Sequence, residues 1–196
     1  NKGIDRATGD YLLFLNSGDY LYSNEILSHF TSLNPTEDIV YGNACYIKNG
    51  VVQEIRQMPS DLKGETILFR TLNHQCTFLK GKLFREGKRY NESYKILADW
   101  VFYNTVVWVD LGSFKHLDFT VSFYDLAGES SISAGRDLIK VERVKFFQEN
   151  ADVFVPAFIL CYQDLKQELG LRTKSRYVRV ALSLRSFVLR IKGVFW

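Results

Sequence analysis

An aspartate that directly follows a short apolar run has the chemistry of a metal ligand. Asp19 ends the polar stretch Asn16-Ser17-Gly18-Asp19, which comes after the apolar run Tyr11–Leu15. Magnesium prefers sites with one or two carboxylates and several phosphate oxygens. Asp19 therefore suits a cation that also binds a diphosphate. The alternative is purely local, because aspartate beside glycine also favours a tight turn.

A second carboxylate, Asp99, precedes the strongly apolar segment from Trp100 to Leu111. At the start of a helix, unpaired N–H groups and the helix dipole stabilise a carboxylate, so capping alone explains this residue. A carboxylate held in a fixed position is also able to remove a proton from a hydroxyl group within its reach. Together, Asp19 and Asp99 would also suit a hydrolase, which needs no nucleotide.

The elements around these residues predict an α/β fold. Tyr11–Leu15 is typical of a strand buried on both faces, and residues 1–8 are expected to be the last turns of a helix ending at Gly9. A helix over 24–33, capped by Ser23 or Asn24, and a strand over 38–41 follow. Asn49-Gly50 indicates a type I′ hairpin.

Further along the chain, we expect a strand over 76–79, a helix from Trp100 to about Leu111, an edge strand over 119–124, and helices over 137–150 and 156–169. This order predicts a Rossmann-like, mostly parallel sheet flanked by helices. Ligands of such sheets bind beyond the carboxyl ends of the strands. The loop from Asn16 to Asp19 lies at such an end.

The opening segment NKGIDRATGDYLLFLNSGDYL closely resembles the stretch that leads into the metal motif of family 2 glycosyltransferases, which have a GT-A fold. It is most similar to the bacterial branch that builds O-antigen and capsular polysaccharides. The resemblance implies that Asp19 binds Mg²⁺ or Mn²⁺ together with a sugar nucleotide. Asn16 stands where many relatives have a first aspartate, and Gly18 replaces a second acidic residue. The implied donor-binding residues are Asn1, Gly3, Asn16, Ser17, Gly18 and Asp19.

Two later segments also resemble this family, and the resemblance covers roughly residues 1–150. It implies that Asp99 is the general base that acts on the acceptor hydroxyl. His74-Gln75 is similar to a segment on the acceptor side, although a single histidine is more often a structural hydrogen-bonding residue. Trp100 either stacks on an acceptor sugar or lies buried beneath the cleft. The segment 123–131 either closes over the site or is a plain surface turn.

The expected activity is an inverting, metal-dependent, hexosyltransferase-like transfer from a nucleotide-diphosphate sugar to a lipid-linked glycan acceptor in surface polysaccharide synthesis. The chain does not begin with methionine, so we expect an N-terminally truncated glycosyltransferase that lacks the base-binding strands. The fragment alone is then expected to be an incomplete site. The rival interpretation is a non-catalytic remnant that docks on a membrane or a partner.

We expect two parts, residues 1–150 from the GT-A domain and 151–196 as a helical extension. Three scattered cysteines argue against a zinc site or a disulfide framework and indicate a reducing compartment, so we expect a cytoplasmic protein. Residues 171–196 contain seven basic and no acidic residues, which leaves 18 basic and 22 acidic residues in the rest of the chain. The basic residues are Arg172, Lys174, Arg176, Arg179, Arg185, Arg190 and Lys192.

Apolar residues recur at three- and four-residue steps in the basic segment 171–196, which predicts an amphipathic helix. Such a helix suits an anionic membrane surface on the inner face of the cell membrane. A packing helix with a solvated basic side is the alternative. Nucleic acid is not expected as a partner, because the segment has no recognised binding motif and residues 1–170 are acidic.

Overall fold

The computed structural model describes residues 1–60, 62, 67–68, 71–126 and 132–155 of the 196-residue chain. The chain divides into two compact units, Asn1–Ile139 and Lys140–Trp196. The expected helix over 156–169 and the basic segment 171–196 lie outside the described residues, as does the part of the expected loop at 127–131. The predicted division at residue 150 therefore stays a prediction.

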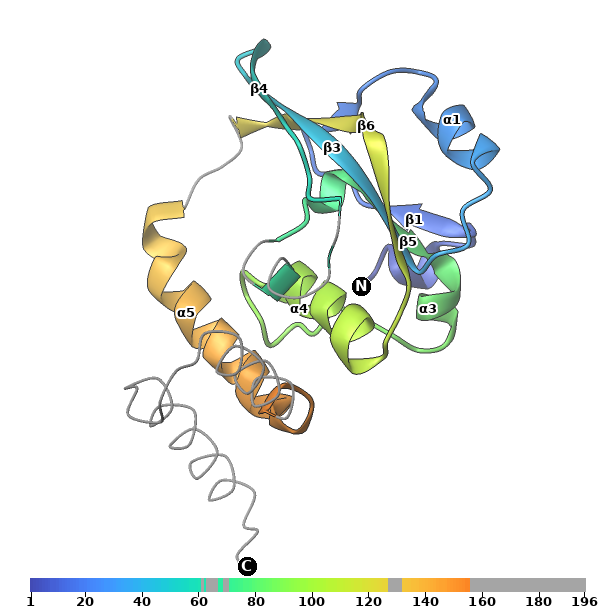
Figure 1. Ribbon diagram of the computed structural model, residues 1–196. Helices are drawn as coiled ribbons and strands as arrows, with labels where there is room; N and C mark the ends of the chain where they lie inside the picture. Colours follow the sequence, from blue (N-terminus) through green and yellow to red (C-terminus); the bar gives the residue numbers. More distant parts are fainter. Residues whose placement is uncertain (61, 63–66, 69–70, 127–131, 156–196) are drawn as a thin grey trace, which may run out of the picture. The chain divides into compact units, whose positions relative to one another are not determined.

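The first unit contains a six-stranded sheet (Figure 1) in the order β1-β5-β3-β6-β2, with β4 also paired to β3. The strands are β1 (Tyr11–Leu13), β2 (Tyr20–Leu21), β3 (Ile39–Lys48), β4 (Val51–Arg56), β5 (Thr77–Lys80) and β6 (Phe114–Asp125). The central strand β3 is buried along nearly its whole length. It pairs with β5 through its first residues, with β4 through its last residues, and with β6 along its other edge.

The α/β class is confirmed, but the expectation of a mostly parallel sheet is wrong for the described strands. Only β3 and β6 pair in parallel, and the four other pairs are antiparallel. The physical reason is that a short apolar run shows that a strand is buried without showing its direction. Direction is set by the connection, and the chain returns from β3 through a tight hairpin rather than a helical crossover.

That hairpin has the geometry that its sequence predicts. Asn49 and Gly50 both have positive φ, at 52° and 74°, as a type I′ turn requires. The turn connects the buried strand β3 to β4, whose six residues are all exposed. Side chains of β4 are thus available to line a surface cavity next to the sheet.

Helices pack on both faces of the sheet. Phe30 of α1 (Ile26–Ser32) stacks on Phe78 of β5 at 3.9 Å between ring centroids. The neighbouring residue Thr77 faces Tyr103 of α4 (Ala98–Asn104). Because successive side chains of a strand point to opposite faces, α1 and α4 cover different faces. The short helix α3 (Gly81–Arg85) follows β5.

Helical structure near the N-terminus is shorter than expected. Residues 1–8 form a single 3₁₀ turn, η1 (Ile4–Arg6), rather than the expected last turns of an α-helix. The predicted helix after Asp99 is confirmed as α4 followed by a π-helical turn, η3 (Thr105–Val109). The backbone then reverses at Leu111, where φ is +55°.

The strand expected over 119–124 is longer than predicted, and it is not an edge strand. β6 runs from Phe114 to Asp125 and lies between β3 and β2. Its weak alternation arises because polar residues such as Ser122 are buried in the middle of the sheet. Strand β2 has only two residues, which is too short a run to be recognised from its pattern.

The helix predicted over 137–150 is confirmed as α5 (Ile132–Glu149), and the boundary between the two units falls within it. In the second unit, Phe146 and Phe147 pack against Phe154, with ring centroids 5.6 Å and 5.1 Å apart. Within the described part of the chain, no helix combines the length and the apolar character needed to cross a membrane.

Candidate functional site

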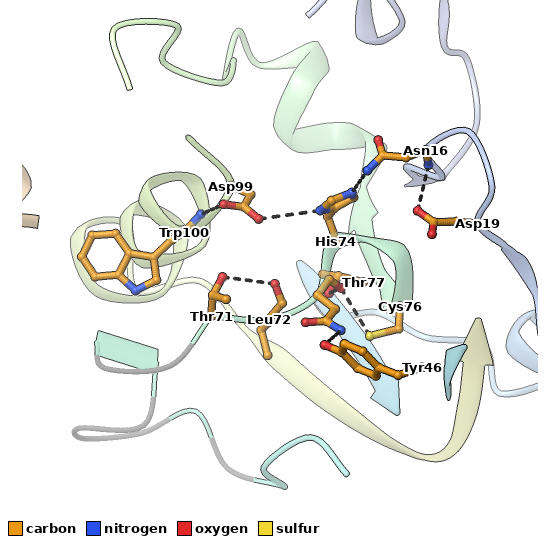
Figure 2. Close-up of polar contacts among 11 residues, drawn as sticks. Asn16, Asp19, Tyr46, Thr71, Leu72, His74, Cys76, Thr77, Asp99 and Trp100 are labelled. Atoms are coloured by element: carbon orange, nitrogen blue, oxygen red, sulfur yellow. Dashed lines mark hydrogen bonds and ion pairs between the residues drawn. The ribbon is translucent and has the colours of Figure 1, made fainter. Parts of the chain in front are cut away.

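The loop after β1 is closed by the carboxylate of Asp19. Its Oδ2 accepts the backbone N–H of Asn16 at 3.2 Å, and its Oδ1 accepts the backbone N–H of Asp125 at 3.1 Å. The first contact fixes the turn, and the second ties the loop to the end of β6, 106 residues away in sequence. Figure 2 shows the bond between Asn16 and Asp19. The turn interpretation and the ligand interpretation of Asp19 are compatible, because each oxygen retains a further lone pair.

A second carboxylate lies beside this loop, and sequence reasoning missed it. A Cβ built on Gly18 would be 3.5 Å from Asp125 Oδ2, so the Asp125 side chain faces Gly18. Gly18 has φ of +95°, a conformation that glycine adopts at little cost. Asp125 thus brings a carboxylate from the end of β6 beside Gly18. The antiparallel register Tyr20↔Phe123 brings the two together, and a sequence without its strand pairing gives no signal of this.

His74 connects this loop to Asp99. It begins the 3₁₀ turn η2 (His74–Cys76), and its Nε2 lies 2.9 Å from Asn16 Nδ2. Its Nδ1 lies 3.7 Å from Asp99 Oδ2 (Figure 2). An amide nitrogen only donates, so Nε2 is the acceptor and the ring proton is on Nδ1, facing the carboxylate. The structure therefore brings together Asn16, Asp19, His74 and Asp99.

Asp99 is the second residue of α4, at the N-terminal end as predicted. Its Oδ1 accepts the backbone N–H of Trp100 at 2.6 Å, and its side chain is 28% exposed. This short contact to a helix N–H fixes one oxygen, while the other faces His74 and the solvent. Orientation by two neighbours together with partial exposure suits a proton acceptor.

A cavity of about 660 Å³ opens beside His74 and Asp99. Its walls come from the strands β3, β4 and β6, the segment before β5, and the start of α4. The lining residues are Tyr46, Gln53, Glu54, Arg56, Thr71, Leu72, Asn73, His74, Gln75, Ile96, Asp99, Tyr124 and Leu126. Its volume is in the range of about 300–1,000 Å³ that is typical of small-molecule sites.

Gln75 and Trp100, the other predicted acceptor-side residues, are in the core. Gln75 belongs to the cavity wall but is only 1% exposed. Trp100 is fully buried and donates its ring N–H to the carbonyl of Ile67 at 3.0 Å. The expectation that Trp100 stacks on a sugar is therefore wrong for this structure, and burial beneath the cleft is the correct alternative. Trp100 follows Asp99 directly in α4, and its side chain packs in the core.

The predicted donor-side residues near the N-terminus have other surroundings. The Asn1 side chain donates to the carbonyl of Tyr90 at 2.9 Å and to Glu92 Oε1 at 2.8 Å, so it holds the segment before α4. Gly3 is exposed and precedes η1, and a Cβ there would meet nothing within 4 Å. Ser17 is exposed in the turn between Asn16 and Asp19.

Two tyrosines near Asp99 stay neutral over the physiological pH range. Burial raises the pKa of Tyr90 and of Tyr103, and the nearby Asp99 carboxylate contributes to both shifts. Desolvation penalises a phenolate, and a second negative charge beside Asp99 would add repulsion. The surroundings of Asp99 on this side are therefore uncharged.

Asp19 and Asp125 are the two carboxylates at this loop that could hold a divalent cation. In the part of the chain that the structure describes, no group of three or more His, Cys, Asp and Glu side chains is arranged to hold a metal ion. Asp19 and Asp125 provide a pair, and magnesium typically takes one or two carboxylates and completes its shell with water and phosphate oxygens. The donor set thus suits a cation shared with a diphosphate.

Comparison with known proteins shows which class of protein the chain is similar to. No family model matches the chain. The PGL/p-HBAD biosynthesis glycosyltransferases of Mycobacterium bovis and Mycobacterium tuberculosis are 33% identical to it over 106 residues. The chain is similar to glycosyltransferases. The match covers 52% of this chain and 40% of each relative, so the chain spans well under half of their length.

The fold agrees with this similarity. The crystal structure of S. aureus TarS superimposes with a TM-score of 0.50 over 81% of this chain and 30% of that chain, at 16% sequence identity. The mixed α/β unit with its curled sheet is GT-A-like, as in glycosyltransferase domains.

Proposed function

We propose that this chain provides the metal-binding and acceptor-binding parts of a family 2 glycosyltransferase site. The observation that carries the proposal is the position of His74, which contacts the Asp19 loop through Asn16 and faces Asp99 on its other side. The loop and the carboxylate thus flank one imidazole at the rim of the cavity. The similarity to glycosyltransferases supports the assignment of these two parts to donor and acceptor.

In the proposed reaction, Asp99 takes the proton of an acceptor hydroxyl that lies in the cavity. The hydroxyl oxygen forms a bond to the anomeric carbon of the donor sugar, and the bond from that carbon to the diphosphate breaks with its electron pair leaving on the diphosphate. Attack from the face opposite the leaving group inverts the anomeric configuration. General-base assistance of this kind contributes about 10²–10⁴-fold to the rate.

Asp19 and Asp125 would hold Mg²⁺ or Mn²⁺ at the donor diphosphate. A bound divalent cation supplies several kcal/mol of stabilisation for negative charge on a leaving group. The protein positions the Asp19 carboxylate by its own hydrogen bonds, because its two oxygens accept from the backbone N–H of Asn16 and from the backbone N–H of Asp125 at the end of β6. The loop is therefore organised before any ligand arrives.

The donor is a nucleotide-diphosphate sugar, and the acceptor is a lipid-linked glycan in a bacterial surface polysaccharide such as O-antigen or capsule. The names of the mycobacterial relatives refer to biosynthesis of PGL and p-HBAD, which supports a role in a biosynthetic glycosylation. The basic segment 171–196 favours a location on the inner face of the cell membrane. That location would place the enzyme at a lipid-linked acceptor.

Calorimetry of sugar-nucleotide binding, with and without Mn²⁺, tests the proposal on this chain and on the longer protein that is expected to contain it. We expect metal-dependent binding by the longer protein, and loss of the metal dependence in Asp19→Asn and in Asp125→Asn. The same affinity for Mn²⁺ in Asp125→Asn as in the unmodified protein would refute the assignment of Asp125. Absence of sugar-nucleotide binding in both folded proteins would favour a non-catalytic docking module.

A further inference from the structure

The charges that line the cavity include one guanidinium, and that group is already bound. Arg56 donates through Nε and Nη2 to Glu54 Oε1, at 3.0 Å and 2.6 Å. Its Nη1 donates to the hydroxyl of Tyr46 at 3.0 Å, and its Cζ lies 4.2 Å from the Tyr46 ring centroid. Arg56 is thus the centre of a cluster, which we call the Arg56 cluster, of Glu54, Arg56 and Tyr46.

The Arg56 cluster has no net charge, because Glu54 cancels Arg56 through their ion pair. Asp99 then adds a second carboxylate to the lining, so its acidic side chains outnumber its one arginine. An anionic ligand would meet two carboxylates and a cation that is already paired, so the lining repels it more than it repels a neutral ligand.

The rest of the lining combines amide groups with apolar side chains, and a sugar ring likewise has polar hydroxyl groups and apolar C–H faces. Asn73 Nδ2 donates to the Tyr46 hydroxyl at 2.6 Å, and Gln53 of β4 also belongs to the lining. The Tyr46 and Tyr124 rings pack at 4.8 Å between centroids. The apolar side chains of the lining are Leu72, Ile96 and Leu126. Hydroxyl groups can exchange hydrogen bonds with the amides while the C–H faces of a sugar cover the apolar parts.

We propose that this cavity binds the terminal sugar of the acceptor and selects a neutral sugar over an acidic one, with Glu54 as the specificity-determining residue. Glu54 excludes acidic sugars in two ways, by holding Arg56 and by repelling a ligand carboxylate. The inference rests on the proposed function for the role of Asp99 as the group that receives the acceptor proton. The selectivity itself is a property of binding and does not depend on turnover.

Binding of methyl glucoside and methyl glucuronide tests this selectivity, because the two sugars differ at C6, where the glucuronide has a carboxylate. Saturation-transfer NMR on the chain at neutral pH measures both affinities. We expect the glucoside to bind at least about tenfold more tightly than the glucuronide. In Glu54→Gln, which removes one charge from a half-exposed side chain, glucuronide affinity rises about tenfold while glucoside affinity changes little.

Glu86→Gln is the matched control, because Glu86 makes an exposed ion pair with Lys82 on α3 and is not part of the lining. We expect this variant to bind both sugars as the unmodified chain does. Equal affinity of the unmodified chain for the two sugars, no binding of either sugar, or an unchanged ratio in Glu54→Gln would each overturn the inference. Sugar binding with the expected ratio in a protein that transfers nothing would instead refute the proposed function alone.

Discussion

At the scale of single residues, His74 lies between the two parts of the candidate site, the loop of Asn16 and Asp19 and the carboxylate of Asp99. Its two ring nitrogens face different groups, the Asn16 amide at 2.9 Å and the Asp99 carboxylate at 3.7 Å. A histidine whose ring is fixed on one side by an amide presents a defined N–H on the other. His74 is therefore expected to act on the reaction by positioning Asp99.

Asp99→Asn should lower the transfer rate by at least about 10²-fold, because the amide cannot accept the acceptor proton. Sugar-nucleotide affinity should not change, since Asp99 contacts Trp100 and His74 rather than the Asp19 loop. Turnover and calorimetry on the same protein give both values. Asp110→Asn removes the same charge from an ion pair with Lys88 and should retain full activity. Normal turnover in Asp99→Asn would exclude Asp99 as the base.

His74→Ala should lower kcat by about 10-fold to 100-fold, the usual effect of losing a side chain that orients a reactive group. His74→Gln should recover part of this loss, because its amide can both accept from Asn16 and donate toward Asp99. The kcat values at saturating donor and acceptor provide the comparison. His29→Ala is the control, since His29 stacks on Phe119 far from this cluster in sequence and does not line the cavity. Equal kcat values for all three variants would show that His74 has no positioning role.

The sequence predicted several of these residues but not all of them. Asp19 and Asp99 could be selected as candidates because Asp19 follows and Asp99 precedes a clear apolar segment. Asp125 could not, since it joins the loop only through the antiparallel pairing of β2 with β6. Trp100 was ambiguous for a related reason, because an aromatic residue beside a carboxylate at the start of a helix can face either the cleft or the core.

At the scale of elements, the parallel pairing of β3 with β6 depends on a glycine. A Cβ on Gly42 would lie 2.7 Å from the carbonyl oxygen of Phe119 and 2.7 Å from a methyl group of Val121. The pairing register also shifts on either side of residue 43. The two strands approach closely here because residue 42 has no side chain, and this approach sets the end of β6 where Asp125 lies.

Gly42→Ala should destabilise the fold by about 1–3 kcal/mol, the usual effect of overpacking a core. The clash with a backbone carbonyl cannot be relieved by a rotamer change. Urea unfolding measures the change in the free energy of unfolding. Gly3→Ala is the control, because a Cβ on Gly3 would meet nothing within 4 Å, and its stability should stay close to that of the unmodified chain. Equal stability of the two variants would show that β3 and β6 can separate at little cost.

The stability of the β3–β6 pair should also depend on pH through His116. Burial lowers the pKa of His116 below its usual value of 6.5, with Asp118 partly opposing the shift. The unfolded chain therefore binds a proton at higher pH than the folded chain, and stability is lost as pH falls through 6.5 toward the folded pKa. The unfolding free energy of the unmodified chain minus that of His116→Gln should decrease from pH 7.5 to pH 5.5, because only the unmodified chain loses this contribution. Urea unfolding across this range measures it, and an increasing difference toward acid would contradict the prediction.

Local elements were largely predictable, but their partners were not. The hairpin at Asn49-Gly50 and the helix after Asp99 follow from positive-φ residues and apolar patterning, which act within a few residues. The position of β6 inside the sheet depends on β2, a two-residue strand stabilised by pairing alone. Strand direction depends in the same way on contacts between distant segments, so the mostly parallel sheet was wrongly predicted.

At the scale of the whole molecule, charge is distributed unevenly along the chain. Residues 1–170 contain 18 basic and 22 acidic residues, whereas residues 171–196 contain seven basic and none acidic. Near an anionic membrane each basic residue contributes about 1 kcal/mol, so we expect the segment to be attracted to such a surface and the remainder to be repelled. A surface that attracts one segment and repels the rest would orient the protein at a lipid-linked acceptor.

The chain should therefore bind vesicles that contain anionic lipid and should not bind vesicles of neutral lipid. Binding should be lost at about 1 M salt, where the screening length falls to about 3 Å. Replacing Arg172, Arg176, Arg179 and Arg190 by glutamine keeps the length and apolar residues of the segment and should abolish co-sedimentation at low salt. Binding of the unmodified chain that persists at high salt, or equal binding by the glutamine variant, would show that apolar contacts rather than charge hold the segment. The same variants assayed with methyl glucoside show whether the cavity is intact, because its lining lies entirely within residues 46–126.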